Sequence, residues 1–220
     1  MDTPRNNTTN YSFIDIIQLD LGGKQWQALN NNIVRRFTRS IQQNTLRYRG
    51  VVDWVYCSPV GAFMAKCLKP FSLLPDKCAR QSQFEFVIKE HSGQIHKQRR
   101  YCMGASTPFT FSSTFDHRPS IHEEFSGGLG MYLKLVVKKG DLLFRDRGYF
   151  FRIGSWRLPI PSWLSVGRFE LLHRNIDQRR FQVIIRIAHP LLGTLFYQRG
   201  EFLDMRCLNE LNAIPVSYRE

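Results

Sequence analysis

The sequence predicts a mainly β fold of the α+β class: a curved antiparallel sheet or a partly closed β-barrel or sandwich, with short N-terminal helices. Apolar residues recur at helical spacing in the first third of the chain, and after that at every second position. The later segments are separated by turn residues such as Ser92-Gly93 and Lys139-Gly140. Many short strands divided by turns are typical of sandwiches and barrels, and the sequence shows no βαβ alternation.

The N-terminal part is expected to hold a tail and two helices. Residues 1–10 are polar and are predicted to be a disordered tail, and residues 11–220 are expected to form one domain. A first helix, ended by Gly22-Gly23, is marked by apolar residues at helical spacing: Phe13, Ile14, Ile17 and Leu21. The same spacing predicts a second, amphipathic helix at Trp26, Leu29, Ile33, Phe37 and Ile41. The arginines expected on its solvent face are Arg35, Arg36 and Arg39.

Strands and one more helix are predicted along the rest of the chain. A strand at residues 46–57, interrupted at Gly50, precedes a short helix that carries Phe63, Met64 and Cys67. Further strands are expected at residues 84–89, 94–102, 108–115 and 120–125. In the next hairpin, one apolar face of residues 133–137 is expected to pair with residues 142–144, and residues 149–153 continue the sheet.

The last hairpin has the clearest alternation. Placing apolar residues opposite each other pairs Leu171 with Val183 and Phe169 with Ile185. On the other face, this register sets Glu170 opposite Ile184 and Arg168 opposite Arg186. It also implies an odd-length loop near residues 176–177. A closing strand is expected over residues 192–203.

Charge and cysteine content indicate in which cellular compartment the protein is expected and which partners it can attract. The chain has 31 Lys and Arg against 18 Asp and Glu, a net charge of +13, which attracts anionic surfaces. The cations are scattered, so a weak contact with an anionic surface is expected rather than specific nucleic-acid binding. Five cysteines without a CxxC pair indicate reduced thiols. Because neither a signal peptide nor a transmembrane run is recognisable, a cytoplasmic location is expected.

Two histidine positions are candidate functional sites. His122 and Glu124 share one face of a predicted strand, and an imidazole beside a carboxylate can transfer protons or bind a metal. Because zinc sites show tighter, repeated ligand spacing, a polar hairpin end is favoured here, and no metal or cofactor is expected. His189 precedes Pro190 at the end of an apolar strand, where it can meet a ligand or hydrogen-bond to the backbone. For His189 the structural role is favoured, and we expect its ring to be at least half buried.

Three arginines are further candidates for ligand binding. Arg152, Arg168 and Arg186 lie opposite the apolar set of their strands. If that face lines a cavity, their guanidinium groups can bind a carboxylate or phosphate through paired hydrogen bonds. If that face meets water, they are ordinary surface charges; the sequence does not choose between the two, and the surface is slightly favoured.

Motifs spread over nearly the whole chain after the tail resemble a known family. They are Leu21-Gly22, Trp26, Leu29, Gly50, Glu124-Phe125, Leu158-Pro159-Ile160-Pro161, Gly167 and His189-Pro190-Leu191-Leu192-Gly193 with Tyr197, Gly200 and Phe202. They resemble an uncharacterised bacterial domain family of unknown function, found alone or C-terminal to saccharopine-dehydrogenase-like or epimerase-like NAD-binding proteins. The resemblance implies no catalytic residues, and this chain has no GxGxxG motif after a first strand.

Three functions remain open at this point. The first is a non-catalytic module that binds an apolar or anionic-amphipathic small molecule, because a Phe-rich barrel with inward-facing polar groups is typical of ligand pockets. The second is an enzyme that uses His189 or the His122–Glu124 pair as acid–base groups. The third is a basic module that docks on an anionic membrane or nucleic acid. Whether the protein is an enzyme is left open, with a non-catalytic role favoured.

Overall fold

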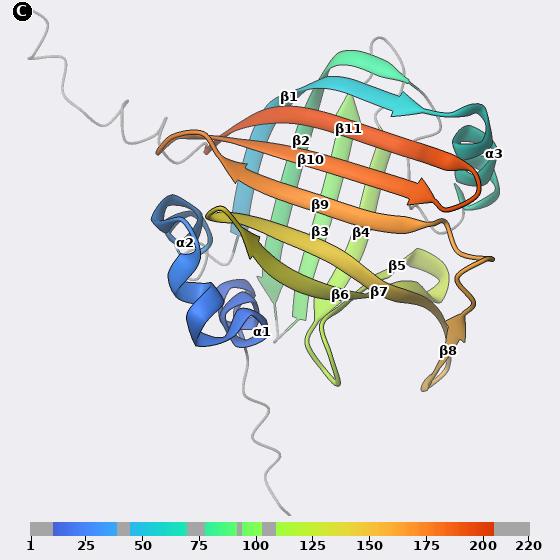
Figure 1. Cartoon of the computed structure of the whole chain (residues 1–220), viewed down its shortest axis with the longest axis horizontal. Coiled ribbons are helices and arrows are strands. Elements are labelled where there is room, and N and C mark those ends of the chain that lie inside the picture. The colour runs from blue at the N-terminus through green and yellow to red at the C-terminus, as the bar shows by residue number, and fades with distance from the viewer. Residues whose placement is uncertain (1–10, 39–44, 70–77, 92–93, 103–108, 205–220) are drawn as a thin grey trace, which may run out of the picture.

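Ten antiparallel strands of this protein close into a β-barrel (Figure 1). The computed structural model describes residues 11–38, 45–69, 78–91, 94–102 and 109–204. Around the barrel the strand order is β6-β5-β4-β3-β2-β1-β11-β10-β9-β7, and pairing of β6 with β7 closes the ring. This confirms the predicted mainly β class with N-terminal helices, and the ring is complete rather than partial.

The helices and strands have the following bounds. The helices are α1 (Phe13–Ala28), α2 (Asn31–Thr38) and α3 (Pro59–Cys67). The first strands are β1 (Thr45–Cys57), β2 (Ala79–His91), β3 (Gln94–Cys102), β4 (Phe109–Asp116) and β5 (His122–Phe125). The remaining strands are β6 (Leu129–Lys138), β7 (Asp141–Ile153), β8 (Trp156–Ile160), β9 (Arg168–Asn175), β10 (Arg180–His189) and β11 (Gly193–Asp204).

Strand β7 pairs with two different strands along one of its edges. Its first part, Leu142 to Arg145, pairs with β9 and so belongs to the ring. Its last part, Tyr149 to Ile153, pairs with β8. Because β8 pairs with β7 alone in the described sheet, the β7–β8 hairpin stands outside the barrel wall.

Helix α1 completes the wall where β5 is too short to do so. Strand β5 has four residues, so its ladder with β6 ends at Tyr132. Beyond that point, the backbone N–H of Leu135 donates to Asp20 Oδ2 at 2.8 Å, and that of Val137 donates to Gln25 Oε1 at 3.1 Å. The first residue of α1 follows Ser12, which forms a capping box with Asp15.

The helical part departs from the prediction in one place. The predicted break at Gly22 is confirmed, since this residue has φ 66° inside α1. However, residues from Trp26 to Phe37 do not form one helix: α1 ends at Ala28, and α2 starts again at Asn31. Asn30 causes the restart, because its side-chain oxygen accepts the N–H of Asn32.

Arg36 is buried, which corrects the expectation that it faces solvent. Its side chain is on the inner side of α2, with 1% of the residue exposed. One guanidinium nitrogen donates to the carbonyl oxygens of Asp177 and Arg180, the latter at 2.9 Å. Arg36 thereby joins α2 to the β9–β10 loop and holds the helices over this end of the barrel.

The predicted register of the last hairpin is wrong by two residues. Val183 pairs with His173, and Ile185 pairs with Leu171. On the outer face, Arg186 lies opposite Glu170, and Arg168 lies opposite Ala188. The loop at residues 176–180 sets this register, because the Asp177 carboxylate accepts the N–H groups of Arg179 and Arg180, both at 2.7 Å. The loop keeps the predicted odd length, so the apolar residues still face inward.

Gly50 marks a close approach of two strands rather than the predicted interruption of β1. It pairs with Phe202 of β11, and a Cβ at Gly50 would overlap the carbonyl oxygen of Glu201 and lie 2.6 Å from Phe202 Cδ1. The irregularity in β1 comes later, between Val52 and Trp54.

A Gly50→Ala variant is therefore expected to lose about 1–3 kcal/mol of unfolding free energy, because β1 and β11 must move apart to hold the methyl group. Gly23→Ala is the matched control, since a Cβ at Gly23 in α1 meets nothing within 4 Å. That control should be neutral or gain up to about 1 kcal/mol. Urea denaturation of both variants measures the difference, and equal stability of Gly50→Ala and the wild type would contradict the close approach.

Candidate functional site

The inside of the barrel is not completely filled. A cavity of about 70 Å³ lies between the helices and the sheet. Its wall is mostly aromatic and aliphatic, including Phe13, Phe84, Phe144, Phe181 and Phe202. A second cavity of about 40 Å³ shares Arg99, Phe169, Leu171 and Ile185 with the first. The interior is thus a Phe-rich chamber divided by a few side chains.

A cluster of charged side chains faces this chamber from β3, β4 and β5. Glu123 accepts hydrogen bonds from Ser113 Oγ at 2.5 Å, from Arg99 at 2.5 Å and from Lys97 Nζ at 3.2 Å. The side chains of Lys97 and Glu123 are 6% and 3% exposed, and that of Arg99 is 15% exposed. We call Lys97, Arg99, Ser113 and Glu123 the interior polar cluster. It combines two cations with one carboxylate.

Aromatic rings stabilise the ammonium group of Lys97. Its Nζ lies 3.8 Å from the ring centroid of Phe115, 5.1 Å from that of Phe13 and 5.8 Å from that of Phe144. Burial nevertheless lowers the pKa of Lys97 to about 8, against the opposing effect of Glu123. At Glu123, burial opposes ionisation, but Arg99 and Lys97 prevail and lower its pKa to about 2.

Two more polar side chains in the chamber have unused hydrogen-bonding atoms. Among the described residues, neither ring nitrogen of His173 has a hydrogen-bond partner, although the residue is 5% exposed. Its ring stacks on Phe181 with centroids 4.5 Å apart. Gln198 is fully buried; its Oε1 accepts from Tyr101 at 2.7 Å, and its Nε2 has no partner. Burial, with a contribution from Arg36, lowers the pKa of His173 to about 3, so this ring is neutral.

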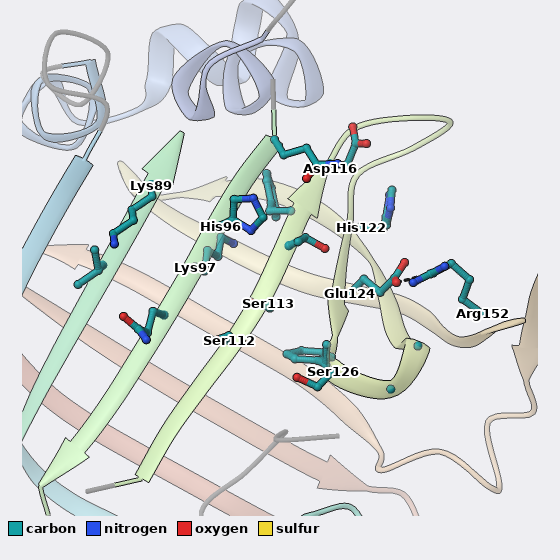
Figure 2. A pocket seen from close by; sticks show the side chains of 18 of the residues that line it. Lys89, His96, Lys97, Ser112, Ser113, Asp116, His122, Glu124, Ser126 and Arg152 are labelled. Atoms are coloured by element: carbon teal, nitrogen blue, oxygen red, sulfur yellow. Dashed lines mark hydrogen bonds and ion pairs between the residues drawn. The ribbon is translucent and has the colours of Figure 1, made fainter. Parts of the chain in front are cut away.

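The predicted candidates His122, Glu124 and Arg152 meet at a groove on the outside of the barrel. The groove has a volume of about 760 Å³ and runs over the outer faces of β3 and β4 toward β5 and the β7–β8 hairpin (Figure 2). Glu124 is paired with Arg152 at 2.5 Å across this groove. The structure thus brings these three residues together, on the surface rather than in the interior.

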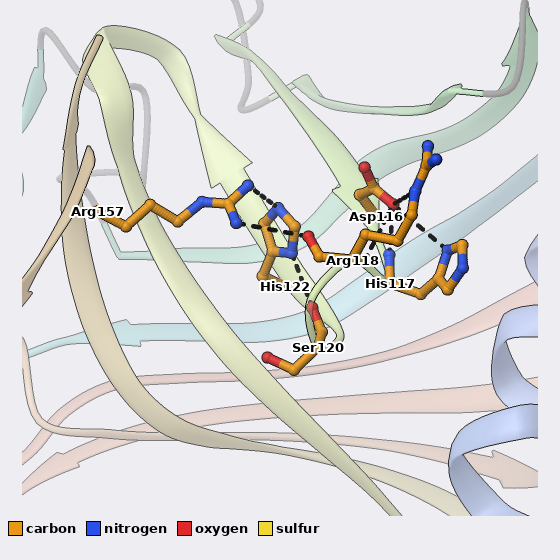
Figure 3. Close-up of polar contacts among 6 residues, drawn as sticks. All are labelled: Asp116, His117, Arg118, Ser120, His122 and Arg157. Carbon is orange, nitrogen blue, oxygen red and sulfur yellow. Dashed lines mark hydrogen bonds and ion pairs between the residues drawn. The ribbon is translucent and has the colours of Figure 1, made fainter. Parts of the chain in front are cut away.

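Both ring nitrogens of His122 are engaged. Nδ1 lies 2.9 Å from the carbonyl oxygen of Ser120, and Nε2 lies 2.8 Å from a guanidinium nitrogen of Arg157 (Figure 3). Because an arginine can only donate, Nε2 accepts and Nδ1 carries the proton. Burial lowers the pKa of His122, and the residue is 3% exposed. In this arrangement His122 orients Arg157, while Glu124 is bound to Arg152.

The other predicted candidates, His189, Arg168 and Arg186, line a second outer groove. This groove has a volume of about 560 Å³ and lies between the start of β9, the end of β10 and the turn at residues 161–167. His189 is 6% exposed, and its Nδ1 accepts the N–H of Leu191 at 3.2 Å. The predicted burial of His189 at the barrel rim is confirmed. Arg168 and Arg186 are exposed.

The sequence analysis missed the polar groups that face the interior. The sequence does contain a signal for these polar groups. Lys97 and Arg99 lie at alternate positions between Ile95 and Tyr101, so strand periodicity puts them on the apolar face. His173 shares a face with Phe169 and Leu171 in the same way. A polar residue at an apolar position of a strand was the clue to these sites.

The described part of the chain was searched for metal-binding groups and for membrane-spanning helices. Among its residues, no group of three or more His, Cys, Asp or Glu side chains is placed to hold a metal ion. No helix within the described ranges is long and apolar enough to cross a membrane.

Comparison with known proteins gives a family but no activity. Residues 29–202 match the family described as Domain of unknown function (DUF4166). No curated protein matches the chain. The chemistry of the site therefore has to be argued from the geometry above.

Glu123→Gln is expected to destabilise the fold by about 3–5 kcal/mol, because it leaves Lys97 and Arg99 buried without their counter-charge. Glu124→Gln, one residue along on the outer face, removes an ion pair to a half-exposed arginine and should cost about 1 kcal/mol or less. Chemical denaturation at neutral pH compares the two. Similar losses for both variants would contradict the assignment of Glu123 to a buried cluster.

His173 is expected to make the fold acid-sensitive. Its pKa is about 3 in the folded protein against an ordinary value of 6.5, so below pH 6.5 the unfolded chain takes up a proton that the folded chain refuses. Stability should fall as the pH is lowered from 6.5 toward 3, by up to about 1.4 kcal/mol per pH unit. His173→Phe should remove this part of the slope, measured by denaturation at several pH values.

The control for His173→Phe is His96→Phe, since His96 is exposed on the outer face of β3. This variant should keep the wild-type pH profile. A wild-type slope retained in His173→Phe would place the acid-sensitive group elsewhere.

Proposed function

The chain belongs to the DUF4166 family, a domain of unknown function, and we propose that it is a non-catalytic binding module. The proposed ligand is a small amphipathic molecule with an anionic head, and the proposed binding site is the interior of the barrel. The single observation that carries this proposal is the interior polar cluster, which holds two cations and one carboxylate inside an aromatic chamber.

Charge is the first argument for an anionic head. Lys97 and Arg99 share one carboxylate, so the cluster carries an excess of positive charge whenever Lys97 is protonated. A buried charge without a counter-charge costs free energy. A carboxylate or phosphate of the ligand beside Arg99 would supply the missing counter-charge and could accept paired hydrogen bonds from the guanidinium.

The wall of the chamber fits an apolar body. Phe86, Phe169, Leu171 and Val183 point inward yet are only partly buried, and all four line the larger cavity. These four side chains therefore contribute apolar surface to the wall of the chamber. At about 70 Å³ the larger cavity holds a few heavy atoms, and a longer chain enters only if Phe169 and Leu171 move and join it to the smaller one.

Unused donors and acceptors in the chamber add specificity. The ring nitrogens of His173 and the Nε2 of Gln198 are buried and have no hydrogen-bond partner in the part of the chain that the structure describes. Binding sites typically combine an apolar wall with a small number of such polar groups. A ligand with an additional hydroxyl or carbonyl group would satisfy them.

The alternative role as an enzyme gains less support. The ring nitrogens of His122 and the carboxylate of Glu124 are bonded to Ser120, Arg157 and Arg152. His189 accepts a backbone hydrogen bond. Arg168 and Arg186 would grip an anion only in the outer groove. The bacterial origin, the link to NAD-binding proteins, the cytoplasmic location and the single domain over residues 11–220 stay predictions.

Binding of straight-chain carboxylates tests the proposal. Butyrate, hexanoate, octanoate and decanoate are titrated calorimetrically, and the best-bound chain length reports the space that opens in the chamber. Arg99→Gln should weaken carboxylate binding about tenfold or more, since a hydrogen bond to a charged group contributes about 1.5–3 kcal/mol. Binding of the matching alcohol should change little.

The matched control is Arg100→Gln, because Arg100 follows Arg99 in β3 and is exposed on its outer face. It should bind carboxylates like the wild type. No heat of binding for any chain length, or equal losses in the two arginine variants, would refute the proposed interior site.

A further inference from the structure

One end of the barrel gathers the exposed apolar side chains. Helices α1 and α2 cover the other end, while α3, the β10–β11 turn, the turn at residues 161–167 and the β7–β8 hairpin surround this one (Figure 1). We call it the α3 end. Its strongly exposed apolar residues are Phe63 (67%), Trp156 (76%), Trp163 (73%), Leu164 (63%) and Leu191 (85%).

The segments that carry these residues are adjacent in space. The N–H of Ser58, which caps α3, donates to the carbonyl oxygen of Leu195 in β11 at 3.0 Å. The turn at residues 161–167 lies against the end of β10, because a Cβ on Gly167 would come within 2.7 Å of the carbonyl oxygen of Ala188. The exposed side chains of α3, the β10–β11 turn and the turn at residues 161–167 thus lie on one rim, and β8 leads directly into the last of these segments.

The same segments contain no acidic residue. Residues 54–69, 147–169 and 181–200 lack Asp and Glu altogether. Their basic residues are Lys66, Lys69, Arg147, Arg152, Arg157, Arg168, Arg186 and Arg199. Arg152 and Arg199 face Glu124 and Asp53 from neighbouring strands. Arg186 lies opposite Glu170, and Arg168 interacts with Asp146. The α3 end therefore combines protruding apolar groups with a surrounding excess of positive charge.

We propose that the α3 end is a docking surface for an anionic lipid membrane. Tryptophan prefers the boundary between lipid headgroups and acyl chains, and leucine and phenylalanine side chains can enter the acyl region. Arginine and lysine beside them reach phosphate and carboxylate headgroups and are attracted by the negative surface potential. The outer groove is lined by Arg147, Arg168 and Arg186 together with Asp146 and Glu170. It opens beside Ser162 and Pro190 on this rim, where headgroups would lie.

Charge also argues against a second copy of the chain as the occupant. A symmetric dimer through this end would bring the acid-free, basic segments of both copies together, and like charges repel across an interface. A membrane that carries negative lipids supplies the complementary charge along with an apolar layer. This docking does not depend on the ligand proposed for the interior.

Vesicle sedimentation tests the proposal, with phosphatidylcholine vesicles that contain or lack phosphatidylserine. The wild type should bind the anionic vesicles, and the bound fraction should fall as salt is added. Trp163→Ser and Leu191→Ser should each weaken binding about tenfold. Arg168→Gln should weaken it roughly fivefold at low salt.

Matched controls come from the helix-covered end. Leu19→Ser changes an exposed leucine of α1, and Lys138→Gln removes an exposed charge at the β6–β7 turn. Both should bind vesicles like the wild type, and the melting temperatures of all five surface variants should match it. Failure of the wild type to bind anionic vesicles would overturn the proposal, as would equal losses in the controls. A concentration-dependent dimer that Leu191→Ser dissociates would assign this surface to a second copy instead.

Discussion

Closure of the hydrogen-bonded ring is the constraint on which the rest of the structure depends. The pairing of β6 with β7 joins the two ends of a ten-strand sheet and removes its free edges. It also separates an interior from water. Only in that interior can Lys97, Arg99 and Glu123 interact at full strength, because their charges are no longer screened by solvent. The perturbed pKa values of Lys97, Glu123 and His173 follow from this separation.

The number of strands explains why the interior needs both large rings and polar groups. Eight strands leave an interior that side chains can just fill, and a ten-strand barrel is wider. The 17 phenylalanines of the chain supply bulk, and many of them meet edge to face inside the wall, as Phe84 does with Tyr101 and Phe202. What the rings do not fill is the divided chamber beside the interior polar cluster. The unfilled space thus results from the same geometry that closes the barrel.

Local periodicity predicted much of the fold, and long-range geometry accounts for the failures. The alternation of Phe84 and Ile88 and the hairpin that sets residues 133–137 against residues 142–144 follow from residues close in sequence, and both are found. The register of the last hairpin was wrong because Asp177 stabilises a longer loop, which alternation alone does not reveal. The candidate arginines Arg152, Arg168 and Arg186 lay on the outer face because they were chosen for being opposite to the apolar set. The interior cluster was missed for the converse reason, since Lys97 and Arg99 occupy positions that an apolar pattern counts as core.

The short strand β5 has a further consequence. Over residues 135–137 of β6, the wall is held by the side chains of Asp20 and Gln25 of α1, not by a strand-to-strand ladder. This stretch is a seam, since lifting α1 would break these two hydrogen bonds and leave every strand pairing of the ring in place. The same movement would uncover the apolar residues that α1 buries, among them Phe13, Ile17 and Leu21. The same helix begins with Phe13, whose ring touches both Phe115 and the ammonium group of Lys97. A hinge-like motion of one helix would therefore bring water to the buried charges while the barrel itself stayed intact.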